Sequence, residues 1–280
     1  MEKFNLHLVS DATGETINAV ARACLVQFEG VKIQEHFWNL IRTQRQLALV
    51  IDGIGQKPGL VLYTFVDENL RRELEAFCAS VKIPCLSILD PVLHSLADFF
   101  QRPFAHQPGK QHALDAEYFA RIAAMDYALA LDDGQGKDHL AEADVILLGV
   151  SRSSKTPTCL YLANRGIKAA NVPIIPGCPL PPGLEQLTGP LIIGLTKDPN
   201  ALVEIRRQRI KQLHGDLDAA YVDPEKVRAE LLEARRLFAR LECPVIDVTR
   251  RSIEETSAEI LTLLTQRRSA AAAAHGTTAS

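Results

Sequence analysis

Residues 145–157, VILLGVSRSSKTP, combine an aliphatic run, a short polar loop and the start of a helix. The first four residues are typical of a buried strand. The loop begins at Gly149 and ends in Lys155 and Thr156. Pro157 then falls in the first helical turn, where a missing N–H costs no hydrogen bond. This order of strand, glycine, Lys-Thr and helix predicts a P-loop, in which backbone N–H groups and the lysine bind phosphate.

The loop departs from the usual pattern G-x-x-x-x-G-K-[ST] at one position, because Ser154 replaces the second glycine. A serine fits there only if its backbone φ need not be positive. The alternative interpretation is an ordinary strand–helix turn on which Lys155 is an exposed surface residue.

Strand-like and helix-like segments alternate on both sides of this loop, which predicts an α/β fold built on two largely parallel sheets with packed helices. Apolar runs such as residues 4–10 and 59–66 read as strands. Asp67, Asp198 and Asp223 stand at helix N-cap positions, and Ser252 has the spacing of a capping box. The helix that starts near residue 43 is expected to end at its glycines.

The connector RPFAHQPGKQ, residues 102–111, separates two αβ runs and is the best domain boundary. We therefore predict an N-terminal α/β domain at residues 1–105 and a P-loop kinase-like domain at residues 106–268. The alanine-rich residues 269–280 are predicted to form a disordered tail.

Composition limits the possible functions. The 280 residues carry 31 Lys and Arg against 34 Asp and Glu, a net charge of −3, so there is no basic excess for nucleic acid. The six cysteines are scattered without metal-ligand spacing, as in reduced cytoplasmic proteins. No apolar run is long enough to cross a membrane, and no signal peptide is recognisable. These features predict a cytoplasmic protein that binds neither nucleic acid nor membrane.

Several motifs resemble one family. They are HLVSDATGET, RIAAMDYALALDDG, GVSRSSKTP followed by LYLANRG and AANVPIIP, and GLTKDPNALVEIRRQR. In this order they are similar to the pyruvate, phosphate dikinase regulatory proteins, a family that includes the phosphoenolpyruvate synthase regulators. The resemblance extends from about Phe4 to Leu264. Dikinase-type members tend to carry Ser-Lys-Thr in the loop and synthase-type members Gly-Lys-Thr, so Ser154 favours the dikinase as target.

The resemblance implies a bifunctional enzyme. Members phosphorylate a threonine of the dikinase with ADP as donor and so inactivate it. They also remove that phosphate by attack of inorganic phosphate, which gives pyrophosphate. The implied partners are therefore the dikinase, ADP and phosphate, together with Mg²⁺. A homodimer is plausible by base rate alone.

The resemblance and the chemistry of phosphoryl transfer together suggest the site. The predicted nucleotide-binding residues are Gly149, Val150, Ser151, Arg152, Ser153, Ser154, Lys155, Thr156, Arg206 and Arg209. Lys155 would contact the phosphates and Thr156 a Mg²⁺ ion. Arg152 would clamp phosphate or point to solvent. Arg206 and Arg209 lie three residues apart on one helix face, as lid arginines or as an exposed charged face.

The base for the threonine hydroxyl has three candidates. Asp132 and Asp133 lie in LDDG, and Asp11 lies in the turn SDATGE. The alternative role for each is capping of a helix or turn. His7 is a weaker candidate because a histidine in an apolar strand is more often packed in the core.

Two other functional classes remain open at this point. A P-loop protein that binds nucleotide without catalysis would act as a sensor. A small-molecule kinase would pass phosphate from ATP to a metabolite.

Overall fold

The computed structural model describes residues 3–104, 116–132, 137–213 and 219–276, and the chain divides into two compact units, Met1–Ala113 and Leu114–Ser280. Each unit is an α/β fold with one four-stranded, fully parallel sheet. The predicted fold class is therefore confirmed.

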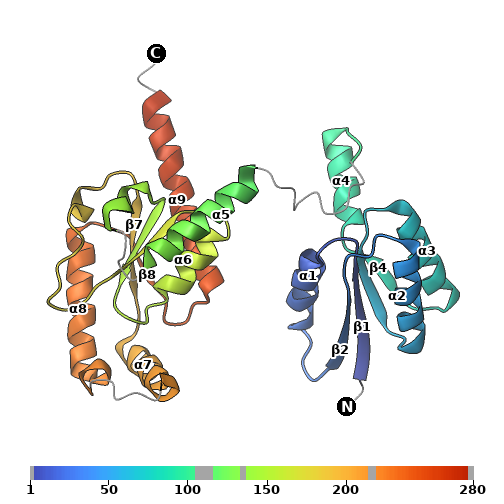
Figure 1. Ribbon diagram of the computed structural model, residues 1–280, viewed down its shortest axis with the longest axis horizontal. Helices are drawn as coiled ribbons and strands as arrows, with labels where there is room; N and C mark the ends of the chain where they lie inside the picture. The colour runs from blue at the N-terminus through green and yellow to red at the C-terminus, as the bar shows by residue number, and fades with distance from the viewer. Residues whose placement is uncertain (1–2, 105–115, 133–136, 214–218, 277–280) are drawn as a thin grey trace. The chain divides into compact units, whose positions relative to one another are not determined.

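The N-terminal unit alternates strands and helices (Figure 1). Its strands are β1 (Lys3–Ser10), β2 (Lys32–Trp38), β3 (Leu60–Thr64) and β4 (Cys85–Ser87), and its helices are α1 (Glu15–Leu25), α2 (Gln44–Gln56), α3 (Glu68–Ser80) and α4 (Asp90–Phe100). The strand order is β2-β1-β3-β4. Helices α2 and α3 cover one face of the sheet and α1 covers the other.

Glycine ends no helix where the sequence suggested it would. Helix α2 continues through Gly53 and Gly55 to Gln56, and the ring of Trp38 packs against its backbone at Gly53. A Cβ added at Gly53 would lie 2.5 Å from the Trp38 ring, so glycine is required there for packing. The expectation that the glycines stop this helix was wrong, since a tertiary contact outweighs the helix propensity of glycine, about 1 kcal/mol.

His7 is a core residue of the N-terminal unit, as the sequence suggested. It is fully buried on β1, its Nε2 lies 2.8 Å from the Lys57 carbonyl oxygen, and its Nδ1 accepts a hydrogen bond from Trp38 Nε1. The ring is therefore neutral, with its proton on Nε2. Burial lowers the pKa of His7 below its ordinary value of 6.5, against the opposing effect of the Lys57 hydrogen bond.

The lowered pKa of His7 predicts acid sensitivity. The unfolded chain binds a proton near pH 6.5 that the folded chain binds only at lower pH. The stability that His7 contributes is therefore complete above pH 6.5 and is lost as the pH falls through the folded pKa. Urea unfolding between pH 7.5 and pH 5 should show this loss, and a His7→Gln variant should show a smaller one. If the free energy of unfolding fell equally with pH in the two proteins, the loss could not be assigned to His7.

The C-terminal unit begins with α5 (Ala116–Ala130). Its strands are β5 (Val145–Gly149), β6 (Ala169–Pro173), β7 (Leu191–Thr196) and β8 (Val245–Asp247), and its other helices are α6 (Lys155–Ala163), α7 (Pro199–Leu213), α8 (Pro224–Arg240) and α9 (Ile253–Gly276). Short 3₁₀ turns occupy Lys137–Glu142, Leu184–Gln186 and Ala219–Val222. The strand order is β6-β5-β7-β8, the same relative order as in the first sheet.

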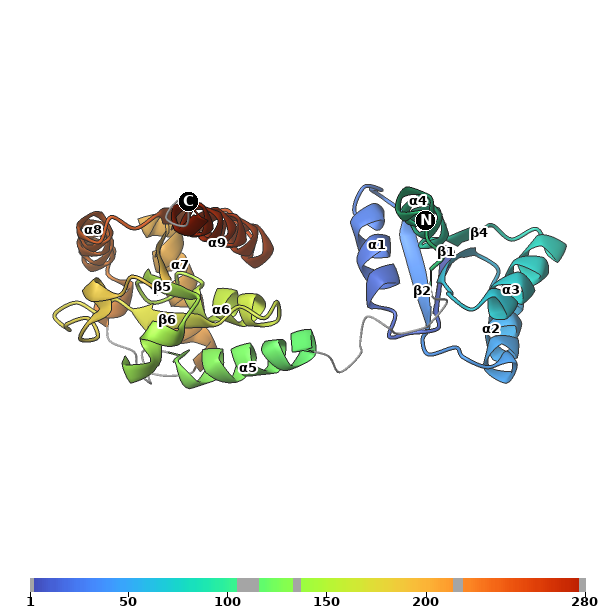
Figure 2. The ribbon, with the colours of Figure 1, turned by 90° about the horizontal axis from the view of Figure 1, so that it is seen from above.

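Strand β5 is central and wholly buried, as its aliphatic sequence predicts. Alternate residues face opposite layers, because side chains in a strand alternate between the two faces. Ile146 and Leu148 pack with α7 and α8, whereas Val145 and Leu147 pack with α5, α6 and α9. Figures 1 and 2 show these helices on the two sides of the sheet.

The predicted helix starts are confirmed. Asp67, Asp198 and Asp223 each accept hydrogen bonds from backbone N–H groups of the helix that follows. Ser252 and Glu255 form the reciprocal bonds of a capping box. Helix α9 extends to Gly276, past residue 268, where the sequence suggested that the folded part ends.

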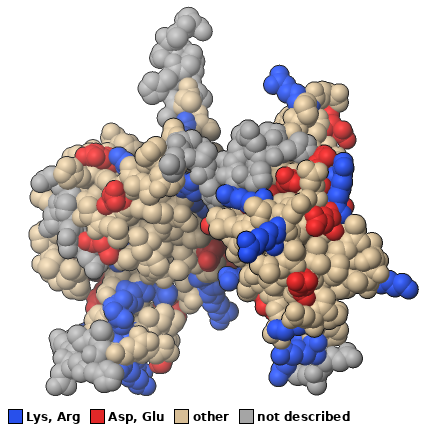
Figure 3. All heavy atoms as spheres, turned by 45° about the vertical axis from the view of Figure 1, so that its right-hand side comes forward, with Lys and Arg blue, Asp and Glu red and all other residues tan. Residues whose placement is uncertain are grey.

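Charge and hydropathy in the structure agree with the composition. In the part of the chain that the structure describes, no helix has the length and apolar character of a membrane span. On the face drawn in Figure 3, basic and acidic side chains are interspersed.

The C-terminal sheet has a place where two neighbouring strands send the chain to opposite faces of the sheet. In the C-terminal unit this switch point lies between β5, which leads to α6, and β7, which leads to α7 on the other face. Ligands of open α/β sheets bind beyond the carboxyl ends of the strands at such points. The loop of residues 150–154 and the turn after Thr196 both lie there.

Candidate functional site

The loop between β5 and α6 is shaped by close backbone packing at its start. A Cβ added to Gly149 would lie 2.5 Å from Ser153 Oγ and 2.9 Å from the Leu195 carbonyl oxygen on the neighbouring strand β7. Ser153 is buried, and its Oγ donates to the Val150 carbonyl. The glycine therefore lets the loop turn back tightly beside β7.

Two non-glycine residues of the loop have left-handed backbones. Arg152 has φ 70° and Ser154, which caps α6, has φ 66°. The expectation that a serine at 154 requires a negative φ was wrong. The loop keeps the left-handed geometry of the usual glycine, and the serine tolerates it at a cost of about 1–2 kcal/mol.

Glycine should fit position 154 better than serine. We expect Ser154→Gly to raise the free energy of unfolding by up to about 1 kcal/mol, because relief of the left-handed strain exceeds the added freedom of the unfolded chain. Ser154→Val should lower it, since β-branched side chains are disfavoured at positive φ. Chemical denaturation followed by circular dichroism measures both. A Ser154→Gly protein less stable than the parent would rule out this backbone explanation.

The loop presents backbone donors. Among the described residues, no acceptor is found for the N–H groups of Ser151, Arg152 and Ser154. They precede the N-terminus of α6, whose first-turn N–H groups carry a partial positive charge. Such a set of donors is suited to an anion.

Lys155 and Thr156 follow directly. Lys155 is 5% exposed, and its Nζ donates to the Val150 carbonyl oxygen at 3.0 Å, so the lysine folds back over the loop. Thr156 Oγ1 donates to Asp132 Oδ1 at 2.9 Å. Asn171 on β6 donates from Nδ2 to the same carboxylate oxygen at 2.6 Å and to Thr156 Oγ1 at 2.9 Å.

Arg206 braces the loop from the opposite layer. It is 1% exposed on α7 and forms a double hydrogen bond with the Glu230 carboxylate of α8, at 2.6 and 3.2 Å. It also donates to the carbonyl oxygens of Ser151 and Tyr221, and its guanidinium stacks on the Tyr221 ring. The structure thus fixes Arg206 as a buried support of the loop.

A cavity of about 740 Å³ opens in front of the loop. Its wall includes residues of the loop, of α6, of the segment after β6 and of α7. The charged residues that line it are Arg152, Lys155, Lys197, Arg206 and Glu230. Because Glu230 neutralises Arg206, the cavity keeps an excess of positive charge, which attracts anions.

Sequence reasoning missed two side chains of this site. Lys197 follows β7 and is 6% exposed. Burial lowers the pKa of its amine, and the Asp247 carboxylate partly offsets this. Asn171 is 1% exposed inside the apolar strand β6. A polar residue within or directly after an aliphatic run was the available signal for both.

Three further predicted residues are Asp11, Arg209 and Asp133. Asp11 belongs to the N-terminal unit, where it is 1% exposed and its Oδ2 accepts from the Val66 N–H at 2.7 Å. Burial raises the pKa of Asp11, although the hydrogen bonds from backbone N–H groups lower it. Arg209 is half-buried on α7 and is not part of the cavity wall, and Asp133 lies outside the described residues.

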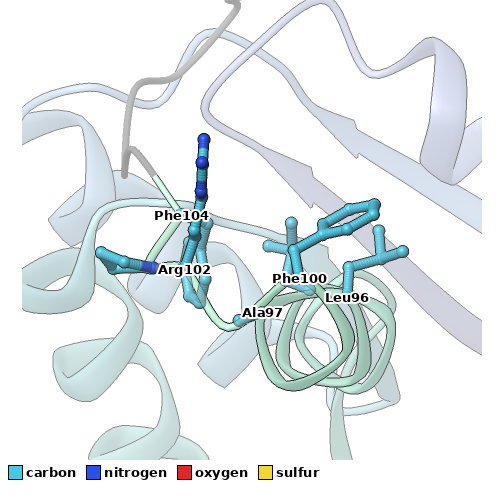
Figure 4. Close-up of a pocket in the computed structure, with 7 residues that line it drawn as sticks. Leu96, Ala97, Phe100, Arg102 and Phe104 are labelled. Atoms are coloured by element: carbon cyan, nitrogen blue, oxygen red, sulfur yellow. The ribbon is translucent and has the colours of Figure 1, made fainter.

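Two further hollows belong to the N-terminal unit. One of about 530 Å³ is lined by Leu96, Ala97 and Phe100 of α4 and by Arg102 and Phe104 after it (Figure 4). The other, of about 420 Å³, is lined mainly by apolar residues at the amino ends of the strands, including Phe4, Leu6 and Phe28. Neither wall has several charged side chains, so the cavity of the C-terminal unit is the candidate site.

Oxygen atoms of side chains near the loop also fit a hard cation as ligands. The described residues contain no group of three His, Cys, Asp or Glu side chains that could hold a metal ion by themselves. Thr156 and Asp132 offer a hydroxyl and a carboxylate oxygen side by side. Mg²⁺ is commonly held by one or two such ligands together with water and substrate phosphates. The residues present therefore fit a magnesium ion that arrives with a phosphate.

The chain was compared with known proteins. Residues 6–261 match the family model described as kinase/pyrophosphorylase. A protein of Paramagnetospirillum magneticum is 56% identical over 263 residues, which are 94% of this chain and 85% of the relative. Relatives from Rhodospirillum rubrum and Caulobacter vibrioides are 51% and 50% identical, cover 93% of this chain each, and are themselves covered to 95% and 83%. All three carry the name pyruvate, phosphate dikinase regulatory protein.

Proposed function

Because the chain belongs to the kinase/pyrophosphorylase family, we propose that it phosphorylates a threonine of pyruvate, phosphate dikinase with ADP and removes that phosphate by phosphorolysis. One observation carries the proposal. The loop with free backbone donors and the buried Lys155 opens into a cationic cavity at the switch point of the sheet. The names of the relatives support the choice of protein substrate.

The two reactions share one phosphoryl group. In the forward direction the threonine oxygen attacks the β-phosphorus of ADP, the bond to the bridging oxygen breaks, and AMP leaves. The hydroxyl proton passes to a base. In the other direction an oxygen of inorganic phosphate attacks the phosphothreonine, pyrophosphate forms, and the threonine oxygen recovers a proton.

The chain's residues bind and orient these groups. The N–H groups of the loop and Lys155 would hold the phosphates of ADP, and they act mainly by neutralising charge and fixing an in-line geometry. Thr156 and Asp132 would hold Mg²⁺, which supplies further charge neutralisation on the phosphate oxygens when bound. Asn171 donates to both the Asp132 carboxylate and the Thr156 hydroxyl and so holds the two groups side by side.

All six cysteines are free thiols, which agrees with a reducing compartment such as the cytoplasm. The pool of ADP and phosphate there would supply both reactions. A homodimer stays a prediction.

Asp132 has two possible roles, and one substitution separates them. If Asp132 accepts the threonine proton, Asp132→Asn should lower kcat by about 10²–10⁴-fold with little change in ADP affinity. If it only orients Thr156 and the metal ion, ADP affinity in the presence of Mg²⁺ should fall instead. Single-turnover transfer and isothermal titration measure the two quantities. Asp126→Asn, on α5, serves as the matched control.

The test of the function is transfer of label. Purified protein is incubated with dikinase and ADP labelled at the β-phosphate, and label on a dikinase threonine is the expected result. Phosphoenolpyruvate synthase is assayed in parallel, and transfer to it alone would replace the dikinase as target. Binding of ADP without transfer would favour a sensor. Transfer from ATP to a small metabolite would identify a small-molecule kinase.

A further inference from the structure

Lys197 is a largely buried cation for which the described residues supply no partner. It is 6% exposed, and among the described residues it has neither a hydrogen bond nor an ion pair. The Asp247 carboxylate acts on the amine electrostatically, but among the described residues the two groups form no ion pair. Its side chain faces the cavity in front of the loop.

The other two buried lysine and arginine side chains of the described residues, Lys155 and Arg206, have partners. Arg206 pairs with Glu230, and Lys155 donates to the Val150 carbonyl. A buried charge that lacks such a partner destabilises a fold, and Lys and Arg are seldom buried unless paired. No contact within the described chain therefore offsets the partial desolvation of the Lys197 amine, which lines the cavity.

The position of Lys197 is that of a ligand-binding residue. In the parallel pairing of β5 and β7, Leu148 lies opposite Gly194, so the P-loop and the turn at Lys197 leave the same edge of the sheet. The N-terminus of α7 does not offer these N–H groups to an anion, because the Asp198 carboxylate already accepts from the N–H groups of Asn200 and Ala201. Next to this helix N-terminus, the amine of Lys197 is a hydrogen-bond donor for which the described residues supply no acceptor.

We infer that Lys197 binds a phosphate group in this cavity, in a second anion subsite beside the one formed by the P-loop. The inference rests on the proposed function, which requires two phosphoryl groups at once in each direction. In the forward reaction these are the α- and β-phosphates of ADP. In the return reaction they are phosphothreonine and inorganic phosphate. The shared ligand chemistry is an anionic phosphoryl group, and its source is either the nucleotide or free phosphate.

The test compares Lys197→Met with the parent in the full-length chain, with ADP and inorganic phosphate as separate probes. Titration calorimetry should give a loss of about 10- to 100-fold in affinity for at least one probe, as expected for a lost charged hydrogen bond. The ligand-free variant should melt about 2–4 °C higher, since an unpaired buried charge is removed. Lys226→Met, an exposed lysine on α8, is the control and should change neither quantity.

The probe for which affinity is lost identifies the source of the phosphate group that Lys197 binds. A loss confined to inorganic phosphate assigns the subsite to the return reaction, and a loss of ADP affinity assigns it to the nucleotide. Unchanged affinity for both probes, with label transfer intact in the parent, overturns the inference and leaves the proposed function standing. A parent protein that binds neither probe overturns both. Lys197→Gln gives the same comparison if the methionine variant does not fold.

Discussion

Lys155→Met is expected to lower both transfer to the dikinase and phosphorolysis, each by about 10²–10³-fold, because one charged donor aimed at a transferring group contributes on that order. Methionine keeps the length of the side chain that folds over the loop but removes the amine that contacts phosphate and the Val150 carbonyl. The two reactions should fail together, since one cavity would serve both.

Label transfer and pyrophosphate release measure the two activities of Lys155→Met. Lys226→Met again serves as the control, and thermal melting tests whether the variant is folded. Loss of transfer with phosphorolysis intact would argue that the two reactions use separate sites. ADP affinity should fall as well, because the ground state also carries the phosphate charge.

Glu230→Ala should lower the free energy of unfolding of the C-terminal unit by about 3–5 kcal/mol, because removal of one partner leaves a buried charge uncompensated. Arg206 would then keep only its bonds to two carbonyl oxygens and its stacking on Tyr221. Urea denaturation followed by circular dichroism measures the change.

Two comparisons test whether burial causes this effect. Arg228→Met breaks the exposed pair with Glu225 on the same helix and should cost less than about 1 kcal/mol. The double variant Arg206→Met with Glu230→Leu should recover much of the stability, since it leaves no unpaired charge. A Glu230→Ala protein as stable as the Arg228→Met protein would show that Arg206 needs no carboxylate.

Much of the fold follows from local sequence. The aliphatic residues of β5, the glycine after it and the capping aspartates act within a few positions of one another, so the elements and the loop between β5 and α6 are predictable. The order of the strands depends on pairing between distant segments, which no local pattern reveals. The switch point that places this loop beside the turn after β7 is therefore visible only in the structure.

The candidate site was predictable to a smaller extent. The loop residues were identified because their types and spacing form a pattern. Lys197 and Asn171 were missed because their importance comes from burial, which one sequence does not record. Arg206 was expected as a lid over phosphate, whereas its carboxylate partner lies 24 residues further along the chain. The left-handed backbone of Ser154 is likewise set by the loop and not by the residue.

The contact between Trp38 and His7 provides an optical signal. Trp38 is the only tryptophan of the chain, and its indole N–H donates to the buried imidazole. Protonation of that ring removes the acceptor and places a charged quencher against the indole, so emission intensity will follow the ionisation of one histidine. The emission originates in the N-terminal unit alone. Fluorescence can therefore report on that unit in the intact, unlabelled chain while ellipticity reports on both.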